Sequence, residues 1–409
     1  MLWTAQRRKL IALACCLFAL FATGWTDAAM ARRDANGFIA KLAADERRVF
    51  EAYLAAKTFY DAEVDAFWGK VESKRKKRRQ KKKTGAVIIT ADYVNAYPPA
   101  YDGPTLPKAL AKAWSDYLSE YDAMGPVKPP AELPSIPDYL REAEAQYGFV
   151  PDRIAEREFK RRYAREALRL GLNGDQVVRV YALETSGLGT ADMQAGIHPI
   201  RKTGKPISSA LGYAQLLAAN SVNELQKHGP TFLKRLQELA REPGIEPARR
   251  SALERKIVAL NKMVKRVARV PQRWSSHQSF AKTGAGMGIH PINIDGDIGP
   301  WLQVMKLKGI HDMAVRAGRA DIGPTELELM NLAGPGTGLE MLTSVGLTMS
   351  TVNFFSRRGY ERNTIVRGKT SRGLLEALST RMDDNVKNSG AIEFYEVFAE
   401  AQREQRAEN

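Results

Sequence analysis

The chain is poor in the residues that build disulfides and metal sites. It has two cysteines, Cys15 and Cys16, in one apolar stretch near the N-terminus. The remaining residues can form no disulfide, so packing must stabilise them. Only five histidines occur. His198 and His290 each precede a proline in two similar Gly-Ile-His-Pro-Ile segments, at a spacing that matches no known set of metal ligands. We predict turns set by proline there, and no metal site.

Several kinds of catalytic site are also missing. The sequence has no Ser-His-Asp pattern, which leaves nucleophilic hydrolysis without support. It has neither a P-loop nor a G-x-G-x-x-G segment after a strand, so nucleotide chemistry is unsupported as well. We therefore expect no cofactor.

The first 31 residues have the features of an export signal. Arg7, Arg8 and Lys9 form a basic start, an apolar run follows at 10–22, and 29–31 reads Ala-Met-Ala, as at a cleavage site. The apolar run is short for a bilayer span, although an uncleaved anchor remains an alternative. We predict an exported protein of the periplasm or cell envelope.

Basic residues outnumber acidic ones, with 62 Lys+Arg against 46 Asp+Glu and a net charge of +16. The signal holds three basic residues and one acidic residue, so the rest carries +14. Such a charge favours anionic partners. In an exported protein these are peptidoglycan or an anionic envelope surface, and no nucleic acid is expected.

The chain before residue 138 divides by composition. Residues 32–85 have helical spacing of apolar side chains and end in the basic run Lys74–Lys83, with nine positive charges in ten residues. We expect this run to be exposed and mobile, either as a solvated linker or as a tether to an anionic surface. Residues 86–137 are rich in proline and form a predicted linker, with a strand at 87–90 and a helix near 108–121.

The segment 177–215 carries the strongest functional signal. Val177, Val180, Tyr181 and Glu184 fall on one face of a helix that begins near 173–175, so a carboxyl group continues an apolar stripe. Ser186-Gly187-Leu188-Gly189, directly after Thr185, ends the helix, because glycine tolerates the left-handed backbone of a helix end. Burial raises the pKa of a carboxyl group, which suits a general acid. A glutamate that merely pairs with an arginine is the alternative.

Three blocks of sequence then resemble the lytic transglycosylases of the goose-lysozyme-like SLT family. Glu184-Thr185 is similar to that family's Glu-Ser pair, and 209–217, Ser-Ala-Leu-Gly-Tyr-Ala-Gln-Leu-Leu, is similar to its G-A-x-G-L-M-Q-L-M block. The third, 331–336, Asn-Leu-Ala-Gly-Pro-Gly, is similar to Y-N-A-G-P-G. The blocks occur in the family's order and span roughly 150–350.

The resemblance implies a mainly α fold with a lysozyme-like catalytic domain at 138–355. A helical insertion lies at about 221–320, and C-terminal helices follow at 356–409. It also implies cleavage of the glycan between N-acetylmuramic acid and N-acetylglucosamine, with Glu184 as acid and then base and a 1,6-anhydro product. Substrate contacts are implied at Thr185, Ser186, Gly212, Tyr213, Gln215, Asn331 and Tyr360.

The third block departs from the family pattern, because Asn331 and Leu332 stand at its Tyr-Asn positions. Two alternatives therefore remain open. A hydrolytic lysozyme needs a second acid, for which Asp192 is the nearby candidate. A catalytically weak peptidoglycan-binding protein would use its basic segments instead.

Overall fold

The computed structural model describes residues 35–124 and 132–408, and the predicted export signal lies outside them. These residues fold into helices joined by turns and loops, with isolated β-bridges and no named strand among them. The predicted mainly α class is confirmed at this level. None of the described helices is both long and apolar enough to cross a membrane.

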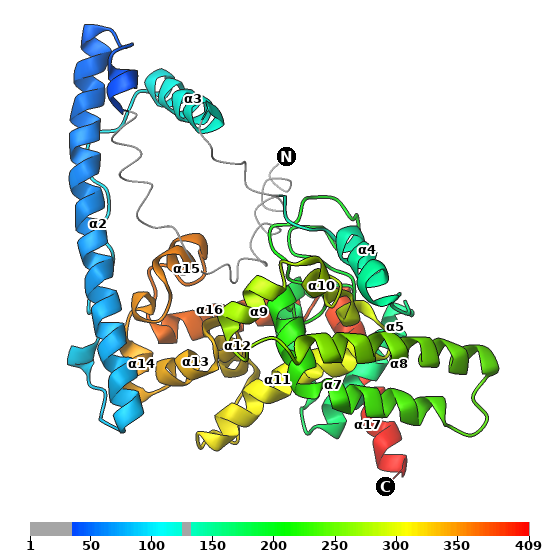
Figure 1. Cartoon of the computed structure of the whole chain (residues 1–409). Helices are drawn as coiled ribbons and strands as arrows, with labels where there is room; N and C mark the ends of the chain where they lie inside the picture. The colour runs from blue at the N-terminus through cyan, green and yellow to red at the C-terminus, as the bar shows by residue number, and fades with distance from the viewer. Residues whose placement is uncertain (1–34, 125–131, 409) are drawn as a thin grey trace.

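A 41-residue helix, α2 (Ala44–Thr84), runs along one side of the molecule (Figure 1). Near its start it carries a small cluster of Phe38, Phe50 and Leu110, the last from α3 (Lys108–Met124). Farther along, Val64, Trp68 and Val71 join the main core. The helix near 108–121 is thus confirmed. The predicted strand at 87–90 is wrong, because this segment leads into a 3-10 turn, η1 (Thr90–Asp92).

The basic run was expected to be exposed and mobile, and it is instead the last part of α2. Arg78 is 2% exposed and bonds to the Glu340 carboxylate at 2.7 Å and to Asn353 O at 2.7 Å. Arg75 donates to Phe355 O at 2.5 Å. Repulsion within the run is offset because its inward cations meet carbonyls and a carboxylate.

The main body contains two apolar clusters that meet along α11. The rest of the chain forms the following elements: α4 (Ile136–Tyr147), α5 (Glu156–Arg169), α6 (Gly174–Thr185), α7 (Ala218–Ala240), α8 (Pro247–Val267), α9 (Trp274–Phe280), α10 (Gly284–Met287), η2 (His290–Ile294), α11 (Ile298–Arg316), α12 (Pro324–Ala333), α13 (Pro335–Met341), α14 (Ser344–Thr348), η3 (Thr351–Asn353), α15 (Arg357–Arg362), α16 (Ser371–Asn385) and α17 (Ser389–Glu408).

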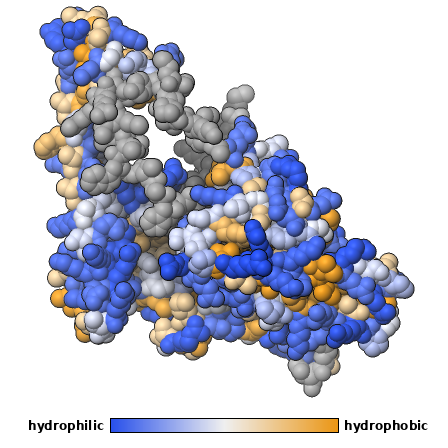
Figure 2. All heavy atoms as spheres, viewed as in Figure 1, coloured by the Kyte–Doolittle hydropathy of each residue, from blue (hydrophilic) through white to orange (hydrophobic). Residues whose placement is uncertain are grey.

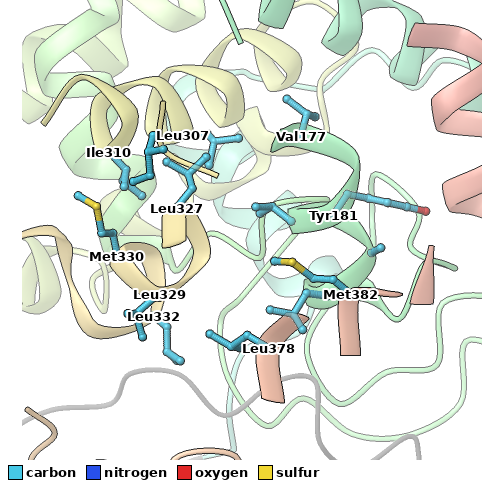
Figure 3. Packing of buried hydrophobic residues seen from close by; sticks show 14 of the residues in the cluster. Val177, Tyr181, Leu307, Ile310, Leu327, Leu329, Met330, Leu332, Leu378 and Met382 are labelled. Atoms are coloured by element: carbon cyan, nitrogen blue, oxygen red, sulfur yellow. The ribbon is translucent and has the colours of Figure 1, made fainter. Parts of the chain in front are cut away.

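The first cluster surrounds α6. Figure 3 shows Leu307 of α11 and Leu327 of α12 on one side of this helix and Met382 of α16 on another. Phe394 of α17 packs against Tyr181 of α6, with ring centroids 5.3 Å apart. Four helices therefore surround α6 with apolar side chains, which fixes the position of its C-terminal end.

The second cluster is built on the segment 221–320 and its neighbours. Leu225 and Phe232 of α7 pack with Leu260 of α8, and Trp301 of α11 belongs to the same group. The later residues of α11, such as Leu307, lie in the first cluster. The predicted insertion is helical, as expected, but its last helix belongs to both cores and brings its side chains to α6.

Candidate functional site

Helix α6 places Glu184 at its C-terminal end. The Asn173 side chain caps the first turn by accepting from the Gln176 amide at 2.8 Å, as the sequence indicates. Ser186, at φ 55°, ends the helix in the left-handed region, and Gly187 follows it at φ 63°. Glu184 thus lies in the last turn of the helix, one residue before its end, and is 7% exposed, on the stripe predicted for it.

Glu184 belongs to a polar cluster inside this apolar core, and we call Glu184, Lys306, Glu328 and Asn331 the acid cluster. The Asn331 amide nitrogen donates to Glu184 Oε1 at 3.0 Å and to Glu328 Oε2 at 3.3 Å. Lys306 of α11 donates to Asn331 Oδ1 at 3.0 Å. Glu328 is 1% exposed and is hydrogen-bonded to Glu184. The amide therefore joins two carboxyl groups to one cation.

Burial changes the protonation of both carboxyl groups. It raises the pKa of Glu184 to about 7, while the hydrogen bond from Glu328 and the Lys306 charge act in the opposite direction. Burial and the Glu184 charge raise the pKa of Glu328 well above its usual range. Burial also lowers the pKa of Lys306. Glu184 is thus poised to donate and accept a proton near neutral pH.

Thr185 and Ser186 support the end of α6. The Thr185 hydroxyl is fully buried and donates to Tyr181 O at 2.7 Å. The carbonyl of Ser186 accepts from the Asn388 side chain at 2.9 Å. Both residues therefore hold the backbone around Glu184, and the Thr185 hydroxyl is engaged within the helix.

The second sequence block forms a tight turn. Leu211 and Leu216 exchange two backbone hydrogen bonds of 3.0 Å around it. Gly212 (φ 78°) and Gln215 (φ 41°) lie in the left-handed region, so both bends are sharp. The Gln215 side chain donates to Gly212 O at 2.8 Å and to Met193 O at 3.3 Å. The family resemblance predicts that Gln215 contacts the sugar. These two hydrogen bonds show that its side chain also holds the loop.

Tyr213 faces the core. It is 1% exposed, and its hydroxyl donates to the Glu156 carboxylate at 2.6 Å. Its ring lies 5.0 Å from that of Tyr181 in α6. Any contact of Tyr213 with a ligand must therefore come from its backbone, and its side chain ties the loop to α6 and α5.

The segment that begins at η2 fixes the loop from the other side. Gln303 of α11 accepts from Ala214 N at 3.0 Å and donates to Asn293 O at 3.1 Å. A Cβ on Gly212 would lie 2.6 Å from the Gln303 amide nitrogen, so only glycine fits there without displacing it. His290 Nε2 lies 2.6 Å from Ser209 O. Lys306 and Gln303 thus connect the loop and the acid cluster through one helix.

The remaining candidates lie in different surroundings. The Tyr360 hydroxyl accepts from Gly368 N at 2.9 Å, and its ring packs on Trp68, with the ring centroids 5.6 Å apart. Tyr360 therefore shares none of these contacts with the acid cluster. Asp192 pairs with Lys202 at 2.7 Å and Arg153 at 2.8 Å. Burial alone would raise the pKa of Asp192, but hydrogen bonds from Lys202, Thr190 and Arg153 lower it to about 2.

The sequence reasoning missed Glu328 and Lys306. Glu328 stands between Leu327 and Leu329 in an apolar helix, which is the same signal that identified Glu184. Lys306 likewise precedes a buried leucine, Leu307, in α11. A search for charged residues inside apolar helices would have found both, and only their spatial meeting needs the structure.

Two surface hollows lie elsewhere among the described residues. One, of about 440 Å³, is lined by residues 269–271, 275, 276, 279 and 280. The other, of about 380 Å³, is lined by Tyr53 and Lys57 of α2, Tyr101 of the loop before α3, and Trp114 of α3. No group of three or more His, Cys, Asp or Glu side chains in the described part of the chain is arranged to hold a metal ion.

The acid cluster and the loop 209–217 with its supports together form the candidate functional site. Comparison of the chain with models of protein families, with curated proteins and with solved structures finds no match.

Proposed function

We propose that the protein is a lytic transglycosylase of peptidoglycan with a lysozyme-like catalytic domain, in which Glu184 acts first as acid and then as base. The observation that carries this proposal is a buried carboxyl group whose pKa is about 7, at the end of a helix inside an apolar core. The three blocks of sequence that resemble the SLT family supply the substrate class.

The proposed reaction needs one carboxyl group. Glu184 donates its proton to the glycosidic oxygen, and the bond from C1 of N-acetylmuramic acid to that oxygen breaks. The acetamido group of the same sugar supports the positive charge that develops at C1. The Glu184 carboxylate then takes the proton of the C6 hydroxyl, whose oxygen bonds to C1 and closes the anhydro ring. The carboxyl group regains its proton, and no water is consumed.

The second carboxyl of the cluster is badly placed for a hydrolase. Acid and partner carboxyls that flank a glycosidic bond lie about 5–5.5 Å apart in retaining enzymes and about 6.5–9.5 Å apart in inverting ones. Glu328 is hydrogen-bonded to Glu184, so no sugar fits between them. Asp192 is held by two cations, and its low pKa makes it a weak base. Both observations favour the one-carboxyl mechanism over a lysozyme.

The test is the variant Glu184→Gln, which keeps the size and polarity of the side chain and removes its acidic proton. Loss of a general acid lowers the rate by about 100-fold or more. We expect that loss when the exported part of the chain is incubated with purified peptidoglycan and the products are analysed by mass spectrometry. Wild-type protein should release anhydro-muropeptides, and the control Asp192→Asn should retain substantial activity.

Other outcomes would refute the proposal in separate ways. Reducing muropeptides from the wild type would identify a hydrolase, and their loss in Asp192→Asn would assign that residue as its second acid. Retained binding to peptidoglycan without any product would identify a binding protein. Wild-type turnover in Glu184→Gln would remove Glu184 from the chemistry.

A further inference from the structure

Glu328 is a buried carboxyl group to which the proposed reaction gives no role. It lies on α12, three residues before Asn331, and is 1% exposed. Its hydrogen bond to Glu184 and its contact with the Asn331 amide, 3.3 Å away, place it beside the proposed acid. A buried carboxyl group costs folding free energy unless its partners compensate, so this placement needs an explanation.

A hydrogen bond between two carboxyl groups requires a proton on one of them, because ionised carboxylates only accept. The Asn331 amide donates to both groups, and Lys306 fixes its orientation by donating to Asn331 Oδ1. The amide therefore cannot turn its oxygen toward the carboxyls. This arrangement satisfies two carboxyl groups that together carry at least one proton.

Charges from neighbouring helices act on this pair mainly through Lys306. Glu224 of α7 is 4% exposed, and its negative charge raises the pKa of Lys306 against the effect of burial. Its own carboxylate contacts Lys227 at 3.5 Å and His228 at 3.5 Å. Burial would raise the pKa of Glu224, yet His228, Lys227 and Lys306 together lower it. Lys306 is thus shared between an ionised Glu224 and the carboxyl pair, which favours a proton on the pair.

The other helices around α6 balance their own charges. Asp383 of α16 pairs with Arg179, and Lys160 of α5 pairs with Glu393 of α17. The side chain of Asn385 adds only an uncharged donor, to Ala182 O at 3.0 Å. The protonation of the pair is therefore set by Lys306 and by the two carboxyl groups themselves.

We propose that Glu328 is a positioning residue that stays protonated through the reaction and donates a hydrogen bond from its hydroxyl to the Glu184 carboxylate. This inference rests on the proposed function of Glu184. When Glu184 gives its proton to the leaving oxygen, its new negative charge lies inside an apolar core. The Glu328 hydroxyl and the Asn331 amide stabilise that charge, so Glu184 releases its proton more easily. Glu328 keeps its own proton, and the balance of the reaction is unchanged.

The test compares two substitutions of Glu328 with a control on the same helix. Glu328→Gln keeps a donor beside Glu184, whereas Glu328→Leu removes it. Glu326→Gln changes a partly exposed carboxylate that pairs with Arg319 at 3.3 Å. Each variant is checked for folding by circular dichroism. Infrared spectroscopy with ¹³C-labelled glutamate then follows the carboxyl groups from acid to alkaline pH.

Wild type and Glu326→Gln should retain one protonated carboxyl group after Glu184 has ionised near pH 7. Glu328→Gln should lose that signal and keep the Glu184 titration close to its place. In Glu328→Leu the titration should move upward by about one pH unit, because a donor to the charged form is gone. Glycan cleavage should fall in Glu328→Leu and be largely kept in Glu328→Gln.

A wild-type spectrum without a protonated carboxyl above pH 7 would overturn the inference, and so would equal titrations of the Leu and Gln variants. The spectra need no substrate, so they separate this inference from the proposed function. The expected titrations without glycan products would leave the pair standing and refute the transglycosylase.

Discussion

Gln303 illustrates how a single buried amide can organise a site from a distance. It is fully buried, and it joins the loop 209–217 to η2 through Ala214 N and Asn293 O. Its amide also lies against Gly212, where a Cβ would clash. Removing this side chain would leave the buried Asn293 carbonyl and the partly buried Ala214 amide without these partners, which costs about 1–3 kcal/mol for a buried group.

The expected result of Gln303→Leu is a loss of several kcal/mol of unfolding free energy. Leucine is similar in size but can neither accept from Ala214 N nor donate to Asn293 O. The measurement is urea unfolding followed by circular dichroism. Gln226→Leu in α7 is the control, because its amide bonds to Val267 O and Val270 O, away from the loop. If both variants were destabilised alike but only Gln303→Leu lost glycan cleavage, the loop would be shown to need this support. Unchanged stability in Gln303→Leu would contradict the prediction.

His290 gives a second prediction at this scale, and it concerns pH. Its Nε2 faces a carbonyl, Ser209 O, which can only accept, so Nε2 carries the proton. Nδ1 lies 2.8 Å from the Ser221 hydroxyl and acts as acceptor. Burial lowers the pKa of His290 to about 4 from 6.5, although the bond to Ser209 acts in the other direction. The folded state therefore keeps this ring neutral where the unfolded state binds a proton.

A depressed histidine pKa contributes stability above pH 6.5 that is lost as pH falls toward 4. The shift corresponds to about 3 kcal/mol at most. We expect the unfolding free energy of the wild type to fall between pH 6.5 and 4, and that of His290→Gln to fall less. Denaturant unfolding at a series of pH values measures both slopes. Parallel slopes would show that His290 is not the responsible group.

At the scale of single residues, the sequence predicted Glu184 and gave Asn331 as a substrate contact, but it did not predict Glu328 or Lys306. An acid on an apolar stripe is visible from spacing, and its burial and raised pKa are as expected. The contact with Glu328 and Asn331 joins residues about 145 positions apart, and no local pattern encodes such a pairing. Tyr360 was chosen by resemblance alone, and its hydroxyl is committed to Gly368 N.

At the scale of elements, helices with clear caps and apolar stripes were predictable. Helix α6 begins in the predicted segment 173–175, with Asn173 as its cap, and it ends at Ser186 and Gly187, where the sequence predicted its end. The strand at 87–90 failed because β-branched residues alone do not make a strand without a partner to pair with. The prediction that the basic run is mobile is wrong, because Arg78 is hydrogen-bonded to Glu340 and Asn353, which are more than 250 residues away in the sequence.

Helix α2 therefore has two different faces within its basic run. Arg78 faces inward, where its guanidinium also lies 4.3 Å from the centre of the Tyr93 ring. The other face carries exposed cations at positions 76, 77, 79 and 83. Figure 2 shows a largely hydrophilic surface over this end of the helix, which lies at the lower left in Figure 1.

For the whole molecule, the net charge of +16 and the exposed face of α2 together predict attraction to an anionic surface. Each basic residue near such a surface contributes on the order of 1 kcal/mol at low salt. Added salt screens this attraction once the Debye length falls below about 10 Å. Since the run is a docked helix, deletion would damage the fold, and substitution of its outward cations is the cleaner experiment.

The last prediction compares the two faces of this run. A variant with Lys76→Gln, Lys77→Gln, Arg79→Gln and Lys83→Gln should keep its unfolding free energy and its cleavage of short soluble glycans. Its binding to intact sacculi, measured by pelleting across a salt series, should weaken at low salt and match the wild type at high salt. Arg78→Met should do the reverse, because it leaves buried polar partners and destabilises the fold by on the order of 3 kcal/mol. Identical salt curves for the fourfold variant and the wild type would show that the exposed face of α2 does not bind the wall. The surface that binds the anionic partner would then have to be sought along α8, whose outward side is also basic.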